Sequence, residues 1–327
     1  MDRRRARSAR LGLGLAVLAA GALAAAADPP LRAQRWLAPG ADAAKALSVA
    51  PTECLARPAD TEAALAVEVG RAAFRSPVVL GGQAARAGLA CEACHRSGRN
   101  NPDFLFPGIS GPPGTADVTA SLFSSHRGDG IDDPRPIPDL SGPRAGLKVP
   151  QAPEARALEP FIHGLVVEEF DGPEPPASVL AGLAAYVRAL RPAACPAAAA
   201  QALSPGLYLD DARRAARAAE TLAARGDRDG ALAMTGAARA RLGLIDERYA
   251  GPALAAQRAA LRRSDAELAA AARALRAGDP AAPAALARWR AGSDSLARRL
   301  ARGEAASLFD PAHLAAAMRG PLPRKAS

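Results

Sequence analysis

The sequence predicts an all-α protein with two parts: a loop-rich helical region, followed by a group of longer helices. Alanine and arginine, which favour helix over strand, dominate the chain, and aromatic residues make up only 4% of its 327 residues. Leucines at 254, 261, 268 and 275 recur every seven residues, the spacing of an apolar helical seam. Glycine and proline are dense between residues 96 and 150, which predicts a long stretch of turns there.

The N-terminus has the pattern of a secretory signal. Residues 2–10 are strongly basic, residues 11–26 form a short apolar run, and small residues precede Asp28. The run is short for a membrane span, although an uncleaved signal would anchor the chain. We therefore expect a signal peptide over 1–27, an extension or linker over 28–60, and export to the periplasm.

The charge is divided unevenly along the chain. The net charge is +9, but five arginines lie within the predicted signal. Residues 28–203 carry 16 basic and 19 acidic side chains, whereas residues 204–327 carry 21 and 13. The basic second half could meet an acidic partner or an anionic membrane surface, or its arginines could simply be solvated. We expect no nucleic-acid partner.

Two helices are predicted on either side of the turn-rich stretch. The first covers residues 61–74, with Thr61 as a possible N-cap and with Gly70 and Phe74 on one face. The second covers residues 176–190, with Ser178 as a possible N-cap. Its apolar stripe contains Leu183, Tyr186, Val187 and Leu190.

A short motif between these helices carries the chemistry. Cys91-Glu92-Ala93-Cys94-His95 has the spacing C-x-x-C-H, in which both thiols can attach to haem vinyl groups and the histidine can ligate the iron. A redox-active Cys91–Cys94 disulfide would need alternating strands and helices, which the sequence lacks. A zinc site would need a second Cys or His pair, and none is nearby.

The motif and its flanking helices resemble the cytochrome c family. The matching positions are Gly70 and Phe74 in the first helix, Cys91 to His95, and Tyr186 in the last helix. The resemblance covers roughly residues 61–191 and implies a cytochrome c-like domain over 61–195 with one covalent haem c, held by Cys91 and Cys94 and ligated by His95. Residues 69–91 are also similar to bacterial di-haem peroxidases, but the single C-x-x-C-H departs from that family.

The resemblance leaves the sixth iron ligand open. Electron carriers of the cytochrome c family usually have a methionine ligand after the motif, but this sequence has no methionine between Met1 and Met234. His126, in a Gly-rich turn, is the preferred ligand, and His163 is the alternative. The iron could also have an open position, or Met234 could reach it; His313 and Met318 are weaker candidates.

The turn-rich stretch supplies further candidates. Arg127, Arg135 and Arg99 could pair with haem propionates, or could be ordinary surface arginines. Aspartates at 117, 129, 132 and 133 are better explained as turn formers than as a calcium site. Because the first and last helices touch in the family fold, the resemblance also implies that Cys54 and Cys195 form a disulfide in an oxidising compartment, with two free thiols as the alternative.

The C-terminal part begins after a linker at 196–206. Helices over 207–320 are separated by breaks near residues 226–230, 250–252, 278–280 and 302–303, and a tail follows at 321–327. Leu286, Trp289, Leu296 and Leu300 suit a partner helix for the leucine seam. We expect a helical bundle or stacked hairpins that serves for docking, dimerisation or structural support.

These features together predict an exported electron-transfer cytochrome with a periplasmic redox protein or dehydrogenase as its partner. A peroxidase-like oxidoreductase with an open or displaceable distal site is the alternative, because the usual methionine is missing. A sensor or scaffold with a regulatory haem is a third possibility.

Overall fold

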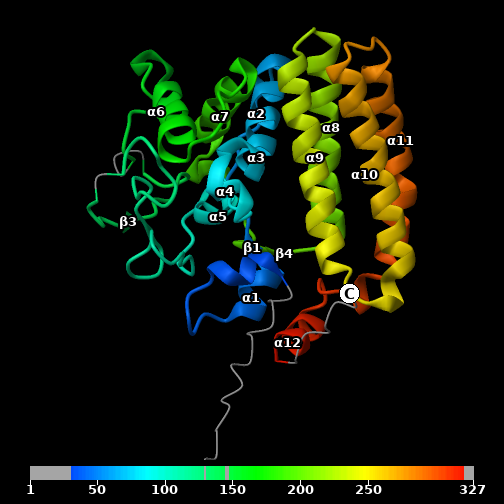
Figure 1. Cartoon of the computed structure of the whole chain (residues 1–327), viewed down its shortest axis with the longest axis horizontal. Coiled ribbons are helices and arrows are strands. Elements are labelled where there is room, and N and C mark those ends of the chain that lie inside the picture. The colour runs from blue at the N-terminus through cyan, green and yellow to red at the C-terminus, as the bar shows by residue number, and fades with distance from the viewer. Residues whose placement is uncertain (1–30, 129, 144–146, 320–327) are drawn as a thin grey trace, which may run out of the picture.

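The computed structural model describes residues 31–128, 130–143 and 147–319, and most of these residues are helical. The prediction of a predominantly helical protein is therefore confirmed. Figure 1 shows two parts side by side, which we call the N-terminal half (residues 31–203) and the C-terminal helices (α8 to α11). The predicted signal at 1–27 and the tail at 321–327 lie outside the described residues. Within them, no helix has the length and apolar character needed to cross a membrane.

The N-terminal half is built from short helices and two small sheets. Its α-helices are α1 (Ala43–Ser48), α2 (Thr61–Phe74), α3 (Pro77–Leu80), α4 (Gly82–Arg86), α5 (Cys91–Cys94), α6 (Leu158–Gly164) and α7 (Ala177–Ala189). A π-helical turn, Leu165–Glu169, directly follows α6. Strands β2 (Thr115–Ala116) and β3 (Arg135–Pro136) pair antiparallel within the turn-rich stretch.

Helices α2 and α7 cross at a pair of glycines. A Cβ atom on Gly70 would lie 1.8 Å from the carbonyl oxygen of Gly182, so the two backbones can approach only because both residues lack side chains. The predicted N-caps are wrong. Asp60, rather than Thr61, caps α2 by accepting from Ala63 N at 2.8 Å, and α7 begins after Pro176 without a side-chain cap.

The predicted extension and linker both contain regular structure. Strand β1 (Val49–Pro51) lies in the extension, and strand β4 (Ala200–Ala202) lies in the linker; the two pair antiparallel. Cys54 and Cys195 form the predicted disulfide beside this pair. The two ends of the N-terminal half are therefore joined by a covalent bond and by a small sheet.

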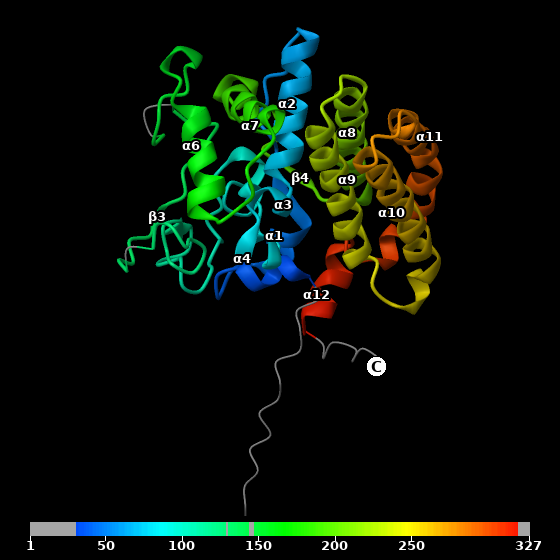
Figure 2. The ribbon, with the colours of Figure 1, turned by 45° about the horizontal axis from the view of Figure 1, so that its top comes forward.

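The C-terminal helices pack against one another and against the N-terminal half (Figure 2). They are α8 (Pro205–Ala224), α9 (Arg228–Arg248), α10 (Ala255–Arg276) and α11 (Ala282–Ala301). The leucine seam is buried, and Trp289 of α11 donates to Ser264 Oγ of α10 at 2.8 Å. The last helix, α12 (Pro311–Arg319), packs against α1.

One apolar core extends through both parts. Buried residues of α2 and α7 belong to the same cluster as those of α8 to α11. A second, smaller core lies within the N-terminal half, beside α5 and the turn-rich stretch. The change in composition at residue 196 thus marks a change in helix length, while the main core continues across it.

Candidate functional site

The C-x-x-C-H motif forms a single helical turn followed by a reversal of the chain. Cys91–Cys94 is α5, and His95 closes the turn by donating its backbone N–H to the Cys91 carbonyl oxygen at 2.8 Å. Gly98 follows with a φ of 75°, and a Cβ there would lie 2.5 Å from the Leu190 side chain. A glycine at 98 therefore lets the segment pack directly against the end of α7.

One hydrogen bond fixes the chemical state of His95. Its Nδ1 lies 3.1 Å from the carbonyl oxygen of Pro138, an acceptor only, so Nδ1 carries the proton and donates it. Burial lowers the pKa of His95 to about 4, so the ring is neutral near pH 7. The other nitrogen, Nε2, is left with a free lone pair, which is the form that binds a metal ion.

The loop that carries Pro138 is itself held in place. Leu140 N–H donates to the Gly98 carbonyl oxygen at 3.1 Å, which ties the loop to the segment after the motif. Asp139 accepts from the backbone N–H and the hydroxyl of Ser141, at 2.8 and 2.6 Å. The orientation of the imidazole is thus determined by residues more than 40 positions downstream.

The two cysteines of the motif are free thiols in apolar surroundings. Burial raises the pKa of Cys91 and of Cys94 to about 12, so both are protonated at neutral pH. Both pack against the smaller core, whose buried members are Leu80, Ala84, Leu89, Phe104, Phe106, Ile109, Phe123, Ile137 and Val166. Two thiols, a free imidazole nitrogen and an apolar wall are the groups that a covalently bound haem requires, so these residues fit it.

The residues that carry the family resemblance lie together. The Phe74 ring lies 6.3 Å from the His95 ring and 5.0 Å from the Tyr186 ring, measured between centroids. The Tyr186 hydroxyl donates to Glu53 Oε1 at 2.5 Å. The helices that cross, α2 and α7, therefore pack beside His95 through the Phe74 and Tyr186 rings.

The two histidines predicted as distal ligands both have acidic partners, and His126 is exposed whereas His163 is half-buried. The His126 side chain is 61% exposed, and its Nε2 lies 3.8 Å from Asp171 Oδ1. The His163 side chain is 35% exposed, and its Nε2 lies 2.8 Å from Glu174 Oε2. The structure gives neither residue a contact with His95, and the ligand assignment stays a prediction.

The predicted propionate partners already pair with carboxylates. Arg127 donates through Nε to Glu168 at 2.7 Å, and Arg135 donates to Asp133 at 2.6 Å. Both are largely exposed, whereas Arg99 lies 3.4 Å from Asp139, next to the carbonyl that binds His95. Among these arginines, Arg99 is the one tied to the motif by the described contacts.

The remaining residues considered as ligands or metal-binding groups pack in the core or pair with neighbouring residues. Met234 is fully buried in the core of the C-terminal helices, Met318 packs near α1, and His313 contacts Asp310. Asp117 accepts from Thr119 and from the Asp133 backbone, as expected of a turn former, and Asp129 lies outside the described residues. Within the described part of the chain, no group of three His, Cys, Asp or Glu residues could hold a metal ion.

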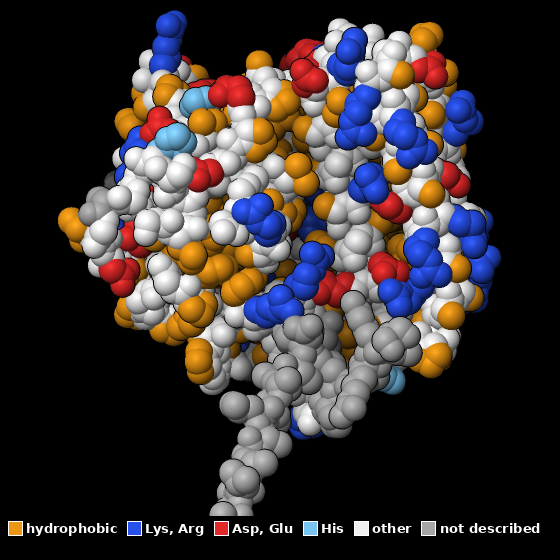
Figure 3. All heavy atoms as spheres, in the orientation of Figure 1, with side chains coloured by type: hydrophobic (Ala, Val, Ile, Leu, Met, Phe, Trp, Pro, Cys, Tyr) orange, Lys and Arg blue, Asp and Glu red, His pale blue; other side chains and the backbone are white. Residues whose placement is uncertain are grey.

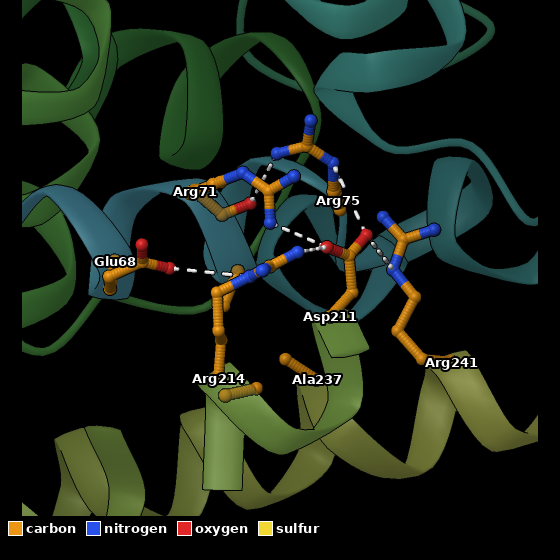
Figure 4. Close-up of a pocket in the computed structure, with 9 residues that line it drawn as sticks. Glu68, Arg71, Arg75, Asp211, Arg214, Ala237 and Arg241 are labelled. Atoms are coloured by element: carbon orange, nitrogen blue, oxygen red, sulfur yellow. Dashed lines mark hydrogen bonds and ion pairs between the residues drawn. The ribbon is translucent and has the colours of Figure 1, made fainter. Parts of the chain in front are cut away.

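Sequence reasoning did not identify a buried ionic cluster behind the motif. We call it the junction cluster; its members are Glu53, Glu68, Arg71, Arg75, Glu92, Asp211, Arg214 and Arg241. Figure 4 shows Arg71 of α2, Arg75 directly after α2 and Arg241 of α9 converging on Asp211 of α8. Four guanidinium groups face four carboxylates, so the cluster is balanced in charge. The sequence offered one signal for this cluster: Arg71 and Arg75 are four residues apart at the end of a helix that also carries core residues.

Glu92 links this cluster to the motif. Its Oε1 accepts from Arg75 Nε at 3.1 Å, and its Oε2 accepts from Arg241 Nη2 at 2.8 Å. Burial alone would raise the pKa of Glu92, but Arg75 and Arg241 outweigh it and hold the pKa below its usual range. Glu92, one of the two residues between the cysteines, is therefore an ionised partner that ties the motif to α9.

Comparison of the chain with protein-family models, with curated proteins and with solved structures found no match. The functional argument therefore depends on the residues themselves.

Proposed function

We propose that this protein is an exported c-type cytochrome that carries one covalent haem and transfers electrons to or from a periplasmic redox partner. The observation that carries the proposal is the state of the motif. Cys91 and Cys94 are free thiols on one helical turn, and His95 is neutral, with Nδ1 bonded to Pro138 and Nε2 available. When bound, the haem would supply one-electron chemistry, and the chain would supply its attachment, one axial ligand and an apolar enclosure.

The fold proposed with this function is a cytochrome c-like domain over 61–195 followed by a helical bundle. The crossing of α2 and α7 at Gly70 and Gly182, with the motif between them in sequence, supports the first part. The packing of α8 to α11 around the leucine seam supports the second.

Covalent haem is tested by producing the protein in a host with c-type maturation and measuring pyridine haemochrome absorbance together with intact mass. We expect one haem per chain, and no covalent haem in the double variant of Cys91→Ser and Cys94→Ser. The double variant of Cys54→Ser and Cys195→Ser is the matched control, because it removes two cysteines but leaves the motif. A mature protein without covalent haem would refute the proposal.

A second candidate is a peroxidase-like oxidoreductase. It is favoured by the absence of methionine between Met1 and Met234 and by the acidic partners that His126 and His163 already have. Optical and EPR spectra of the ferric protein separate the two. A low-spin spectrum lost only in His126→Ala would support histidine ligation by that residue. A high-spin spectrum in the unmodified protein would indicate an open position and favour the enzyme.

We further propose the periplasm as the location and the basic C-terminal helices as the docking face for an acidic redox protein or dehydrogenase. The Cys54–Cys195 disulfide supports an oxidising compartment. Figure 3 shows Lys and Arg side chains spread over the C-terminal helices. A membrane surface rich in anionic lipid is the competing partner, and vesicle co-sedimentation would distinguish it from a protein partner.

A further inference from the structure

A second feature lies on the other side of the motif from the thiols. A cavity of about 410 Å³ opens between η1 (Arg32–Trp36), the segment 90–97 and helices α8 and α9. Glu92, Ala93 and Arg96 line it, whereas Cys91, Cys94 and His95 do not. Its size falls within the range of small-molecule sites. In Figure 3 the surface is hollowed between the two halves, and Lys and Arg side chains gather along the lower part of the hollow.

Most charges around the cavity are already paired. Arg71, Arg75 and Arg241 belong to the balanced junction cluster. Arg32 lies at the mouth and bonds to Glu247. These groups therefore need no further anion.

Two arginines are different. Among the described residues, Arg96 donates only to the carbonyl oxygens of Ala46 and Val49, and Arg248 only to those of Leu47, at 2.6 Å, and Leu308, at 2.9 Å. No carboxylate of the described residues lies within ion-pair distance of either guanidinium. Arg248 is only 5% exposed, so water reaches little of its charge. Within the described part of the chain, the cavity therefore holds two arginines that form no ion pair with a carboxylate.

An aromatic ring and apolar side chains complete the lining. The guanidinium carbons of Arg241 and Arg248 lie 5.6 and 5.9 Å from the centre of the Tyr208 ring. The apolar members are Trp36, Leu37, Phe104, Leu203, Leu207 and Leu244. A ligand that suits this wall has an apolar body and one anionic group.

We infer that this cavity binds a small organic anion, a carboxylate or a phosphate ester, with its charge at Arg96 and Arg248 and its apolar body against Trp36 and Tyr208. Guanidinium groups bind both anions through paired N–H donors, so the charge chemistry is shared. The inference does not depend on haem attachment, because none of the lining residues is one of the three proposed haem-binding groups.

The probes are three molecules with one body and different head groups: benzoate, phenyl phosphate and benzyl alcohol. Isothermal titration calorimetry of the mature protein at low ionic strength measures their binding. We expect one saturable site for the anions and none for benzyl alcohol. The tighter anion identifies whether the natural ligand bears a carboxylate or a phosphate. Equal binding of benzyl alcohol, or no saturable binding of either anion, would overturn the inference.

Two variants locate the binding. Arg96→Gln should weaken anion binding by about tenfold or more, because a charged donor is lost. Gly243→Leu keeps every arginine but fills the cavity: Gly243 lines it, and a Cβ there meets no atom within 4 Å. It should abolish binding.

The matched controls are Gly236→Leu, on the same helix and equally open but outside the cavity lining, and Arg290→Gln on α11. Both should bind as the unmodified protein does. Unchanged affinity in a folded Gly243→Leu would exclude the cavity as the site, whatever the folding of Arg96→Gln.

Discussion

At the scale of single residues, Glu92 has a role that its place in the motif does not indicate. The two positions between the cysteines of C-x-x-C-H have no fixed chemistry, and the motif itself says nothing of this carboxylate. In the structure its two oxygens bond to Arg75, which directly follows α2, and to Arg241 of α9. Both arginines are buried, at 6% exposure each, so this carboxylate neutralises charge that water does not reach.

Replacing Glu92 should therefore be costly. We expect Glu92→Gln to lower the free energy of unfolding by about 3 kcal/mol, because removing one member of a buried ionic group leaves the others uncompensated. Urea unfolding followed by circular dichroism at 222 nm measures the change. Glu62→Gln, which breaks the exposed pair with Arg225, is the control and should change stability little. A similar loss in both variants would contradict the buried-charge explanation.

His95 and Pro138 mark the limit of what residue patterns reveal. The motif predicts that His95 is a ligand, but its hydrogen-bond partner is a backbone carbonyl 43 residues away, which has no side-chain signature. The contacts of His126 have no sequence signature either: Ser125 N–H and the His126 ring both contact Asp171, and the assignment of His126 as a ligand stays a prediction.

At the scale of elements, the long amphipathic helices were the most predictable. The expected range 61–74 is the observed α2, and the range 176–190 exceeds α7 by one residue at each end. Strands β1 and β4 were missed, because each has three residues and gains its hydrogen bonds from a segment about 150 positions away. Such short strands carry no local periodicity.

The α2–α7 crossing allows a paired test of glycine. Gly70→Ala should destabilise the protein by about 3 kcal/mol or more, because the new Cβ would overlap the Gly182 carbonyl and force the helices apart. Gly236→Ala on α9 should stabilise it by about 0.5–1 kcal/mol, since the new methyl meets no atom within 4 Å and alanine favours helix. Thermal unfolding of both variants measures whether the two stability changes have opposite signs. An unchanged melting temperature for Gly70→Ala would show that α2 and α7 can separate without loss of stability.

At the scale of the whole molecule, the two parts behave as one structure. The main apolar core includes α2 and α7 together with α8 to α11, and the junction cluster lies across the same contact. The composition change after residue 195 was visible in the sequence, but the shared core was not. Arg71 and Asp211 lie 140 residues apart, and nothing local to either indicates that they pair.

The junction cluster should make the whole protein sensitive to acid. Burial alone would raise the pKa of Glu53, but Arg75 and Arg71 outweigh it and lower the pKa from 4.5 to about 2. A lowered carboxyl pKa contributes stability above pH 4.5 that is lost as the pH falls toward 2. For Glu53 this amounts to about 3 kcal/mol.

Urea unfolding at several pH values between 7 and 2 measures this loss. Glu53→Gln, which has no carboxyl to titrate, should be less stable at pH 7 but should lose less stability on acidification. Parallel pH profiles for the variant and the unmodified protein would show that Glu53 does not contribute to acid sensitivity.

The Cys54–Cys195 bond joins two residues 141 positions apart and makes residues 54–195 a covalent ring within the N-terminal half. The motif, the Pro138 loop and the crossing helices all lie within that ring, whereas α8 to α12 extend from it as a tail. A single peptide cleavage at an exposed position inside the ring, such as near Ile131, would open the chain without releasing a fragment. The nicked protein would migrate as one species until reduced, and His95 would stay joined to α7 through the disulfide.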